Sequence, residues 1–361
     1  MTPLGLAWEQ ELFLLSPLPL VLLANAAESG ARGRPALRAA TDLLLVLLPA
    51  LVVVVGIGEG LAALATNLPG NAVAGGFGLA LAGLVAGLAG AGPVVRRLPA
   101  AIPIDPASRV HRLALALTTG LVVLQLVTQL TSDVLAQAAG GASLTRADLV
   151  AQEIPFLLAA VLGVGAGTRR RPRAVAERLG WVRPRVWQLL LALAAAGLFY
   201  GFALGVDWLA SWLTPGLANR VNAANGRIFG ALGDPVGIAT IAITAGICEE
   251  AFFRGALQVR LGLLWTAVVF ASVHTQYGLS LDTLAVLVLA IGLGLLRRST
   301  NTTTSTVCHV AYNALVGTGI GGLGLGWALG SEAALLGLAL AATPAARRFL
   351  TSGLGERPRM G

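Results

Sequence analysis

Apolar runs follow one another along almost the whole chain and constrain its fold more than any other feature. A helix needs roughly 20 predominantly apolar residues to cross the hydrocarbon core of a bilayer, and several runs reach that length. The predicted spans lie at about residues 43–66, 72–95, 113–131, 150–167, 187–207, 236–258, 262–276, 281–296, 303–321 and 325–343. The sequence therefore predicts an all-α fold, a polytopic bundle of about ten transmembrane helices.

The composition supports a membrane protein. Hydrophobic residues make up 56% of the chain and charged residues only 12%, whereas a soluble domain is usually about 25% charged. The 46 glycines suit closely packed membrane helices, whose interfaces favour small residues. The two cysteines, Cys248 and Cys308, both lie in apolar runs, so we expect no structural disulfide.

The distribution of positive charge predicts how the chain is inserted. All 25 basic residues are Arg, and the net charge is +8. If the N-terminus is cytoplasmic, the inside segments hold 22 of these arginines and the outside segments hold three. Because this bias follows the positive-inside rule, we interpret the charge as a topology signal and expect no nucleic-acid partner. We expect a multi-pass protein of the cell membrane with both termini in the cytoplasm.

An Arg-rich segment offers the one plausible domain boundary. Residues 1–168 are expected to form an N-terminal region of about four spans, preceded by an interfacial or re-entrant segment near 8–27. Residues 169–186 form the Arg-rich cytoplasmic linker. A second helical bundle is expected at 187–345, followed by a cytoplasmic tail at 346–361.

Polar and ionisable residues recur inside the predicted spans of the second bundle. Such residues are costly in a membrane, so they are functional candidates by default. The set comprises Glu249, Glu250, Arg254, His274, His309 and Asn313. A turn is expected near Leu261, 12 residues after Glu249 and 13 before His274. At the rise of an α-helix both side chains lie about 18–20 Å from that turn, so they should reach similar depth on adjacent helices.

The spacing of these residues also predicts their roles. Glu250 and Arg254 are four residues apart on one helix face, so Arg254 should neutralise Glu250 and leave Glu249 free. A free carboxylate near an imidazole suits general-base work. His309 and Asn313, also four apart, can donate hydrogen bonds to a developing oxyanion. The set therefore predicts amide hydrolysis by an activated water inside the membrane.

These residues resemble the type II CAAX prenyl endopeptidase family, also called the ABI or CPBP family of intramembrane proteases. Its motifs E-E-x-x-x-R, F-x-x-x-H and H-x-x-x-N are matched, in order, by Glu249, Glu250 and Arg254, by Phe270 and His274, and by His309 and Asn313. The resemblance covers roughly residues 187–325. It implies an endopeptidase core at 187–345 that acts on a peptide or membrane protein and contacts membrane lipid.

The resemblance also implies a role for each of these residues. Glu249 with His274 would activate the water, and His309 and Asn313 would stabilise the oxyanion. Glu250 and Arg254 would support them. The family is often labelled metalloprotease, but the chain has no H-E-x-x-H zinc motif, so we expect no cofactor. If a divalent metal such as zinc is present, Glu249, His274 and His309 would supply three ligands.

Other interpretations of the same residues stay open at this stage. Glu250 with Arg254 fits a buried structural ion pair, and His309 with Asn313 fits a hydrogen-bonded pair between helices. The chain as a whole fits an ion- or proton-coupled transporter, or a non-catalytic immunity or scaffold member of the family. Glu153 lies near the outer end of a predicted span, and we expect it to be solvated.

Overall fold

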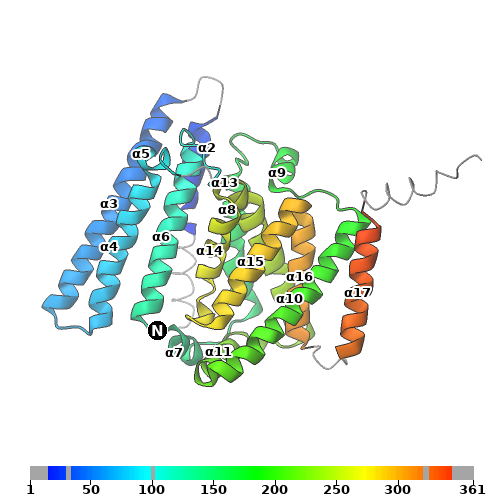
Figure 1. Ribbon diagram of the computed structural model, residues 1–361. Coiled ribbons are helices and arrows are strands. Elements are labelled where there is room, and N and C mark those ends of the chain that lie inside the picture. The colour runs from blue at the N-terminus through cyan, green and yellow to red at the C-terminus, as the bar shows by residue number, and fades with distance from the viewer. Residues whose placement is uncertain (1–14, 30–33, 99–101, 320–324, 344–361) are drawn as a thin grey trace, which may run out of the picture.

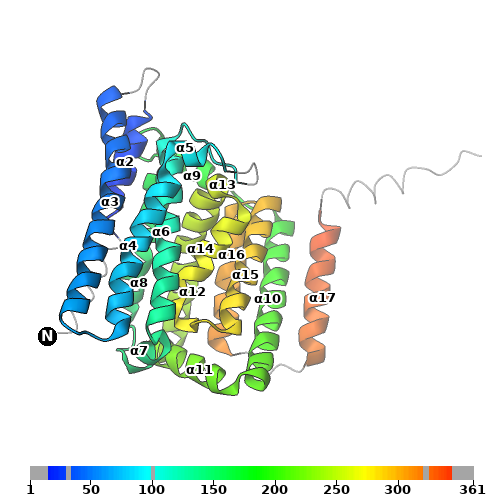
Figure 2. The same ribbon diagram turned by 60° about the vertical axis from the view of Figure 1, so that its left-hand side comes forward.

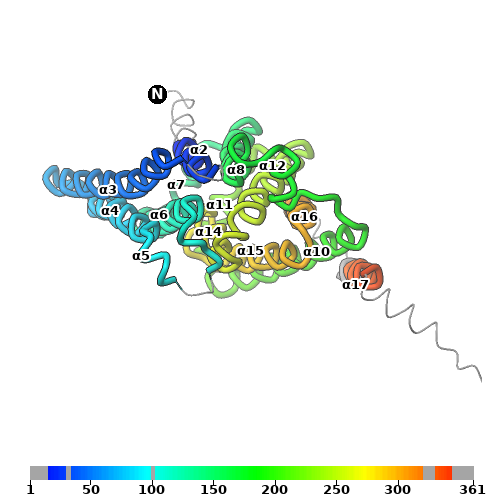
Figure 3. Tube along the Cα trace, turned by 90° about the horizontal axis from the view of Figure 1, so that it is seen from above, coloured from blue at the N-terminus to red at the C-terminus, as the bar shows by residue number. Residues whose placement is uncertain are grey.

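The computed structural model describes residues 15–29, 34–98, 102–319 and 325–343. Over these ranges the chain forms helices and no β-strand, which confirms the all-α prediction. Figure 1 shows the long helices standing side by side in one bundle. Seen from above, α3 and α4 lie at one side, α17 at the other, and α12, α14, α15 and α16 between them (Figure 3). The predicted tail at 346–361 lies outside the described residues.

Each predicted span coincides with a helix. These helices are α3 (Pro35–Ala65), α4 (Gly70–Gly90), α6 (Arg109–Thr131), α8 (Arg146–Gly163), α10 (Val186–Leu213), α12 (Pro235–Glu249), α14 (Leu263–Val273), α15 (Leu281–Ser299), α16 (Thr302–Thr318) and α17 (Leu325–Ala341). In the described ranges, five helices are long and apolar enough to cross a membrane: α3, α4, α6, α10 and the continuous helix Pro235–Leu261. The protein is therefore a polytopic helical membrane protein.

Several helices begin or end some residues away from the predicted bounds, and two of these differences bear on the site. With 11 residues, α14 is only about 16 Å long, about half of a hydrocarbon core. It ends at Val273, where a short 3₁₀ turn, η3 (Thr275–Tyr277), follows. Conversely, α8 begins four residues before the predicted span, because Thr145 and Asp148 form a capping box that starts the helix at Arg146.

The shorter helices lie at the two ends of the bundle. They are α2 (Leu18–Ala27), α5 (Gly92–Val95), α7 (Val134–Gly140), α9 (Pro172–Leu179), α11 (Pro215–Phe229), a 3₁₀ turn η1 (Gly230–Leu232), and α13 (Gln258–Leu261). Figures 1 and 2 show α5, α9 and α13 at one end, with α7 and α11 at the opposite end. We call the first of these the arginine end, because the segments 96–98, 102–112 and 169–185 lie there. This grouping agrees with the predicted charge bias.

Part of the predicted interfacial segment at 8–27 is described, namely α2, which packs against α3, α6 and α8. Its residue Asn25 is fully buried and donates hydrogen bonds to the carbonyls of Leu162 and Gly163 at the end of α8. These bonds satisfy carbonyls that the end of a helix leaves open. The first residues of the predicted segment, before Leu15, lie outside the described part of the chain.

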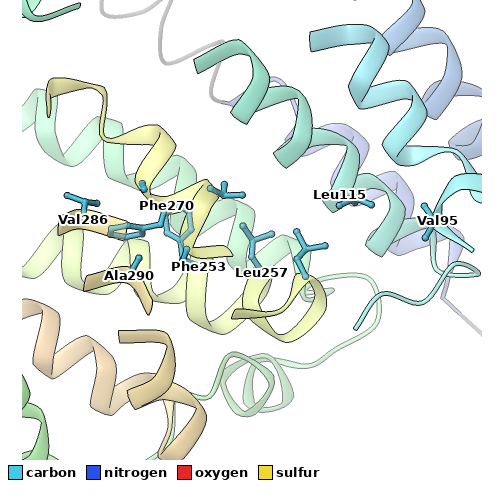
Figure 4. Close-up of a cluster of buried hydrophobic side chains, with 11 residues drawn as sticks. Val95, Leu115, Phe253, Leu257, Phe270, Val286 and Ala290 are labelled. Carbon is cyan, nitrogen blue, oxygen red and sulfur yellow. The ribbon is translucent and has the colours of Figure 1, made fainter. Parts of the chain in front are cut away.

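An aromatic core connects the helices in the middle of the bundle. A π-helical stretch, η2 (Glu250–Leu257), continues α12 and presents Phe253 to Phe270 of α14, with ring centroids 4.9 Å apart. Figure 4 shows these two rings between η2, α14 and α15. The buried cluster around them includes Val95, Leu115, Leu257, Val286 and Ala290. Because membrane helices associate through close van der Waals packing, this cluster holds η2 against its neighbours.

Candidate active site

The helix Pro235–Leu261 carries the first motif across the bundle. It begins at Pro235, where the side chain of Asp234 accepts a hydrogen bond from the backbone of Gly237. Asp234 also forms an ion pair with Arg146, and the hydrogen bond from Arg146 lowers the pKa of this exposed carboxyl. The α-helical hydrogen bonding changes to π-helical at Glu250. Such stretches are rare and often occur at functional sites.

Glu250 and Arg254 form the predicted ion pair. Oε1 of Glu250 lies 3.4 Å from Nη1 of Arg254, and the two side chains are 0% and 1% exposed. A second nitrogen, Nη2, donates to the carbonyl of Ala290 at 3.4 Å. The guanidinium carbon lies 4.5 Å from the ring centroid of Phe270, within the range of a cation–π contact. The buried positive charge is therefore held from three directions.

His309 lies between the two glutamates of the first motif. Its Nδ1 is 3.1 Å from Oε1 of Glu250. A paired carboxylate only accepts hydrogen bonds, so Nδ1 carries the proton and donates it. The other ring nitrogen, Nε2, then faces Oε2 of Glu249 at 4.0 Å. That separation is too long for a direct hydrogen bond. Oε2 of Glu249 is buried and has no hydrogen-bond partner among the described residues.

His274 is positioned by the end of α14. Its backbone N–H bonds to the carbonyl of Ala271, which leaves the carbonyl of Phe270 open. Nδ1 of His274 takes this position at 2.8 Å. A carbonyl only accepts, so Nδ1 carries the proton, and in the neutral ring Nε2 is left as an acceptor. His274 is thus the C-cap of a short helix that ends at Val273. The sequence had predicted it inside a longer helix over 262–276.

The ring of Phe270 lies near both imidazoles. Its centroid lies 4.5 Å from that of His274 and 6.2 Å from that of His309. The contact that the structure gives Glu249 is with His309, whereas the sequence paired Glu249 with His274. Asn313, one turn along α16, is half-buried, and its side chain makes no hydrogen bond to the part of the chain described. Its predicted partnership with His309 stays a prediction.

Glu153 differs from the expectation. It is only 7% exposed, and its Oε2 makes no hydrogen bond within the described ranges. Its carboxyl lies near Glu249 and Cys248 of the neighbouring α12. The expectation of a solvated carboxylate was wrong because α8 begins at Arg146, which places Glu153 in the third turn of the helix.

Aromatic contacts hold the Glu153 face of α8 against the motif helix. Phe156, three residues after Glu153, lies 5.4 Å from Phe252 and 5.6 Å from Phe253, measured between ring centroids. Residues three apart lie on the same face of a helix, so Glu153 also faces η2 and α12. A carboxyl from the N-terminal region therefore joins the site. The only sequence signal for it was an ionisable residue within an apolar run.

The proposed metal ligands do not form a metal site. Glu249, His274 and His309 would have to direct donor atoms at one point, each about 2 Å from a zinc ion. Within the described residues, no three His, Cys, Asp or Glu side chains are arranged in this way. Nδ1 of His309 is already engaged with Glu250. The residues as placed therefore do not fit a bound metal, and we derive no step through one.

The same stretch of chain matches a known family. Residues 231–315 match the family model of the type II CAAX prenyl endopeptidase Rce1-like proteins. This segment is Rce1-like. The match includes all three motifs but under a quarter of the chain, and it is narrower than the predicted 187–325. No curated protein matches the chain, and no solved structure does. The resemblance is thus confirmed for the segment that holds Glu249, His274 and His309, in a CAAX-protease-like membrane protein.

Proposed function

We propose that the protein is an intramembrane endopeptidase of the cell membrane that hydrolyses a peptide bond in a peptide or membrane protein. The observation that carries this proposal is the pair formed by Glu249 and His309. A buried carboxylate oxygen that has no hydrogen-bond partner in the described ranges faces an imidazole whose other nitrogen is held by a second carboxylate. The arrangement lies inside the Rce1-like segment. By the positive-inside rule, the arginine end faces the cytoplasm.

In the proposed reaction, Glu249 removes a proton from a water molecule whose oxygen attacks the carbonyl carbon of the scissile bond. The carbonyl oxygen becomes an oxyanion in a tetrahedral intermediate. When the C–N bond breaks, the proton held by Glu249 passes to the leaving nitrogen. Nε2 of His274, free to accept, assists in orienting the water. The products are a new carboxylate and a new amine.

Glu250 supports His309 in this scheme. An imidazole donates from both nitrogens only when it is positively charged. The hydrogen bond from Nδ1 to Glu250 orients the ring, and Nε2 of the doubly protonated imidazole would donate to the oxyanion. Arg254 in turn balances Glu250, which keeps the buried cluster from carrying an uncompensated negative charge. The amide of Asn313 is the second proposed oxyanion donor.

The proposal is tested by incubating the purified full chain with a panel of membrane-anchored peptides, alongside Glu249→Ala and His274→Ala. We expect cleavage by the wild type and none by either variant. Equal cleavage by all three proteins would reject the proposal. Ion flux in proteoliposomes that Glu249→Gln abolishes, without any cleavage, would assign the chain to transport instead. A phenotype that survives Glu249→Ala in the cell would assign it to a scaffold or immunity role.

Removal of metal ions gives a separate prediction. Because the described carboxylate and imidazole donors do not converge on one point, we expect cleavage to continue after exhaustive dialysis against a chelator. The measurement is the initial cleavage rate before and after dialysis, with metal content checked by elemental analysis. A loss of activity that added zinc restores would contradict the metal-free mechanism.

Glu153 gives a prediction with two readouts. A buried polar group without a hydrogen-bond partner destabilises the folded state by about 1–3 kcal/mol. Oε2 of Glu153 is such a group within the described residues. Glu153→Met, which is similar in volume, should therefore raise the free energy of unfolding by about the same amount. If Glu153 also serves the site, the same variant should lower the cleavage rate. Thermal unfolding in detergent micelles and initial rates measure the two effects. A lower unfolding temperature with an unchanged rate would contradict both.

A further inference from the structure

Four arginines from separate segments gather at the arginine end. Arg169 and Arg170 follow α8, Arg178 belongs to α9, and Arg260 belongs to α13. Arg169 and Arg170 both lie against Gly165, just after α8, and Arg260 donates a hydrogen bond to the carbonyl of Gly163, two residues earlier. Arg178 is near enough for its charge to act on Arg170 and Arg260. Arg260 is only 4% exposed, so part of this charge is buried. We refer to these four residues as the arginine cluster.

One carboxylate forms an ion pair with the arginine cluster within the described residues. Glu28 bonds through Oε2 to Nη1 of Arg169 at 2.6 Å. Its other oxygen, Oε1, already accepts from the hydroxyl of Ser108 at 2.8 Å and from the backbone of Val110 at 3.1 Å. Glu28 is thus fully engaged and neutralises a single arginine.

The other contacts of the cluster are with uncharged oxygens. Nη2 of Arg169 donates to Oδ1 of Asn25 at 2.7 Å, and Nη1 of Arg260 donates to the carbonyl of Ala256. Two further contacts are with the C-terminal end of α8. Nη2 of Arg260 donates to the carbonyl of Gly163 at 3.1 Å, and Arg170 donates to the carbonyl of Val164. A helix C-terminus carries about half a negative charge, which favours cations there. Together, Glu28 and the C-terminus of α8 balance less than half of the positive charge of the four guanidinium groups. More than about two charges stay without compensation in the described structure.

Several donors of the cluster have no acceptor. Nε of Arg169 and Nε of Arg260 are buried and make no hydrogen bond to the residues described. Burial, followed by the charges of Arg170, Arg297 and Arg169, lowers the pKa of Arg178 below its usual value. Buried donors and charges of this kind are costly unless an anion meets them. The cluster therefore lacks an acceptor of high negative charge.

The end of α9 that carries Arg178 is held against the bundle. Leu179 is fully buried, and its carbonyl accepts a hydrogen bond from the hydroxyl of Thr302 at 2.6 Å. Gly255 of η2 lies against the same carbonyl, and a Cβ there would approach it to 2.8 Å. On the same helix, Arg173 points away, because its side chain is 92% exposed and paired with Glu177 at 3.0 Å.

We propose that the arginine cluster is a binding site for a phosphate group, carried by an acidic phospholipid headgroup or by a soluble phosphate compound. Guanidinium groups match the oxygens of phosphate through paired, charge-assisted hydrogen bonds. Basic pockets between membrane helices at the cytoplasmic surface bind such headgroups in other proteins. Arg169 is 21% exposed, so the site is reachable from outside the bundle. This proposal does not depend on the proposed protease activity.

The test uses the full chain in detergent and native mass spectrometry with two lipid probes, phosphatidylglycerol and phosphatidylcholine. We expect the acidic lipid to bind the wild type more tightly. Arg178→Gln should weaken that binding about tenfold, as expected for the loss of one charge-assisted hydrogen bond. Arg173→Gln is the matched control, because it removes the same charge from the same helix, and it should leave binding within about twofold. Arg170→Gln provides a second variant of the cluster.

Inorganic phosphate and glycerol phosphate distinguish the source of the anion. If they compete with phosphatidylglycerol at millimolar concentration, and Arg178→Gln weakens their binding too, the site exists and its ligand is a soluble phosphate compound. If they do not compete but phosphatidylglycerol binds as expected, the site exists and its ligand is a lipid headgroup. Equal binding of both lipids by the wild type would overturn the proposal, as would equal losses in Arg178→Gln and Arg173→Gln. Thermal unfolding of each variant confirms that the losses come from folded protein.

Discussion

We expect that replacing Glu249 by Gln lowers the cleavage rate by about 10²–10⁴-fold, the usual contribution of a general base, while the protein stays folded. The substitution keeps the shape of the side chain and removes the group that accepts the proton. Oε2 of Glu249 has no hydrogen bond to lose in the described structure, so the free energy of unfolding should not fall. Initial rates at saturating peptide and thermal unfolding in detergent measure the two quantities.

The matched control for this change is Glu177→Gln. Glu177 is an exposed carboxylate, paired with Arg173 on α9, and its removal should change neither rate nor stability. Cleavage by Glu249→Gln at the wild-type rate would remove Glu249 from the mechanism. A variant that unfolds would leave the rate uninterpretable, so Glu249→Asp, which keeps the carboxylate but shortens its reach, is measured alongside. We expect Glu249→Asp to be folded and to retain a low cleavage rate.

Replacing Arg254 by Gln lowers the free energy of unfolding by about 3–5 kcal/mol, because it leaves the charge of Glu250 buried without its partner. The double variant Glu250→Gln with Arg254→Gln should recover a large part of this loss, since both charges are then removed together. Chemical unfolding in detergent micelles for the two single variants and the double variant gives the coupling energy between the residues.

Arg173→Gln is the control for this second prediction. It breaks an exposed pair, which contributes about 0–1 kcal/mol. Losses in Arg254→Gln no larger than in Arg173→Gln would mean that Glu250 and Arg254 are not a buried pair in the folded protein. The result also separates two roles of this pair. If the stable double variant still cleaves peptides at the wild-type rate, the pair is structural and does not support His309.

Features that depend on local spacing could be predicted from the sequence. The apolar runs predicted the helices, because a helix in a bilayer needs a long apolar segment. Glu250 and Arg254 were predicted to pair because they are four residues apart on one helix. The three motifs were enough to identify the resemblance that the match at 231–315 confirms.

Features that depend on how helices pack sideways could not be predicted. The contact of Glu249 with His309 joins residues that are 60 positions apart and lie on different helices, and the spacing within one helix says nothing about it. Depth alone placed His274 opposite Glu249, but α14 ends at Val273 and the side chain of His274 turns back to the carbonyl of Phe270. A hydropathy pattern does not contain that capping contact.

The error over Glu153 has a similar cause. Hydropathy begins a span at the first apolar residue, whereas the helix begins at its cap, Thr145, and includes the polar first turn. The extra turn moves Glu153 from the predicted membrane surface to a buried position beside α12 and η2. The family match gives no help there, because Glu153 lies outside residues 231–315.

The central claim is that a water molecule activated at Glu249 breaks a peptide bond, and isotope labelling tests it most directly. The purified full chain is mixed in ¹⁸O-labelled water with a membrane-anchored peptide under single-turnover conditions, and the fragments are weighed by mass spectrometry. We predict that the N-terminal fragment carries one ¹⁸O atom in its new C-terminal carboxylate. The wild type should form this fragment and Glu249→Gln should not. Fragments formed equally by both proteins, or fragments without the label, would contradict the account.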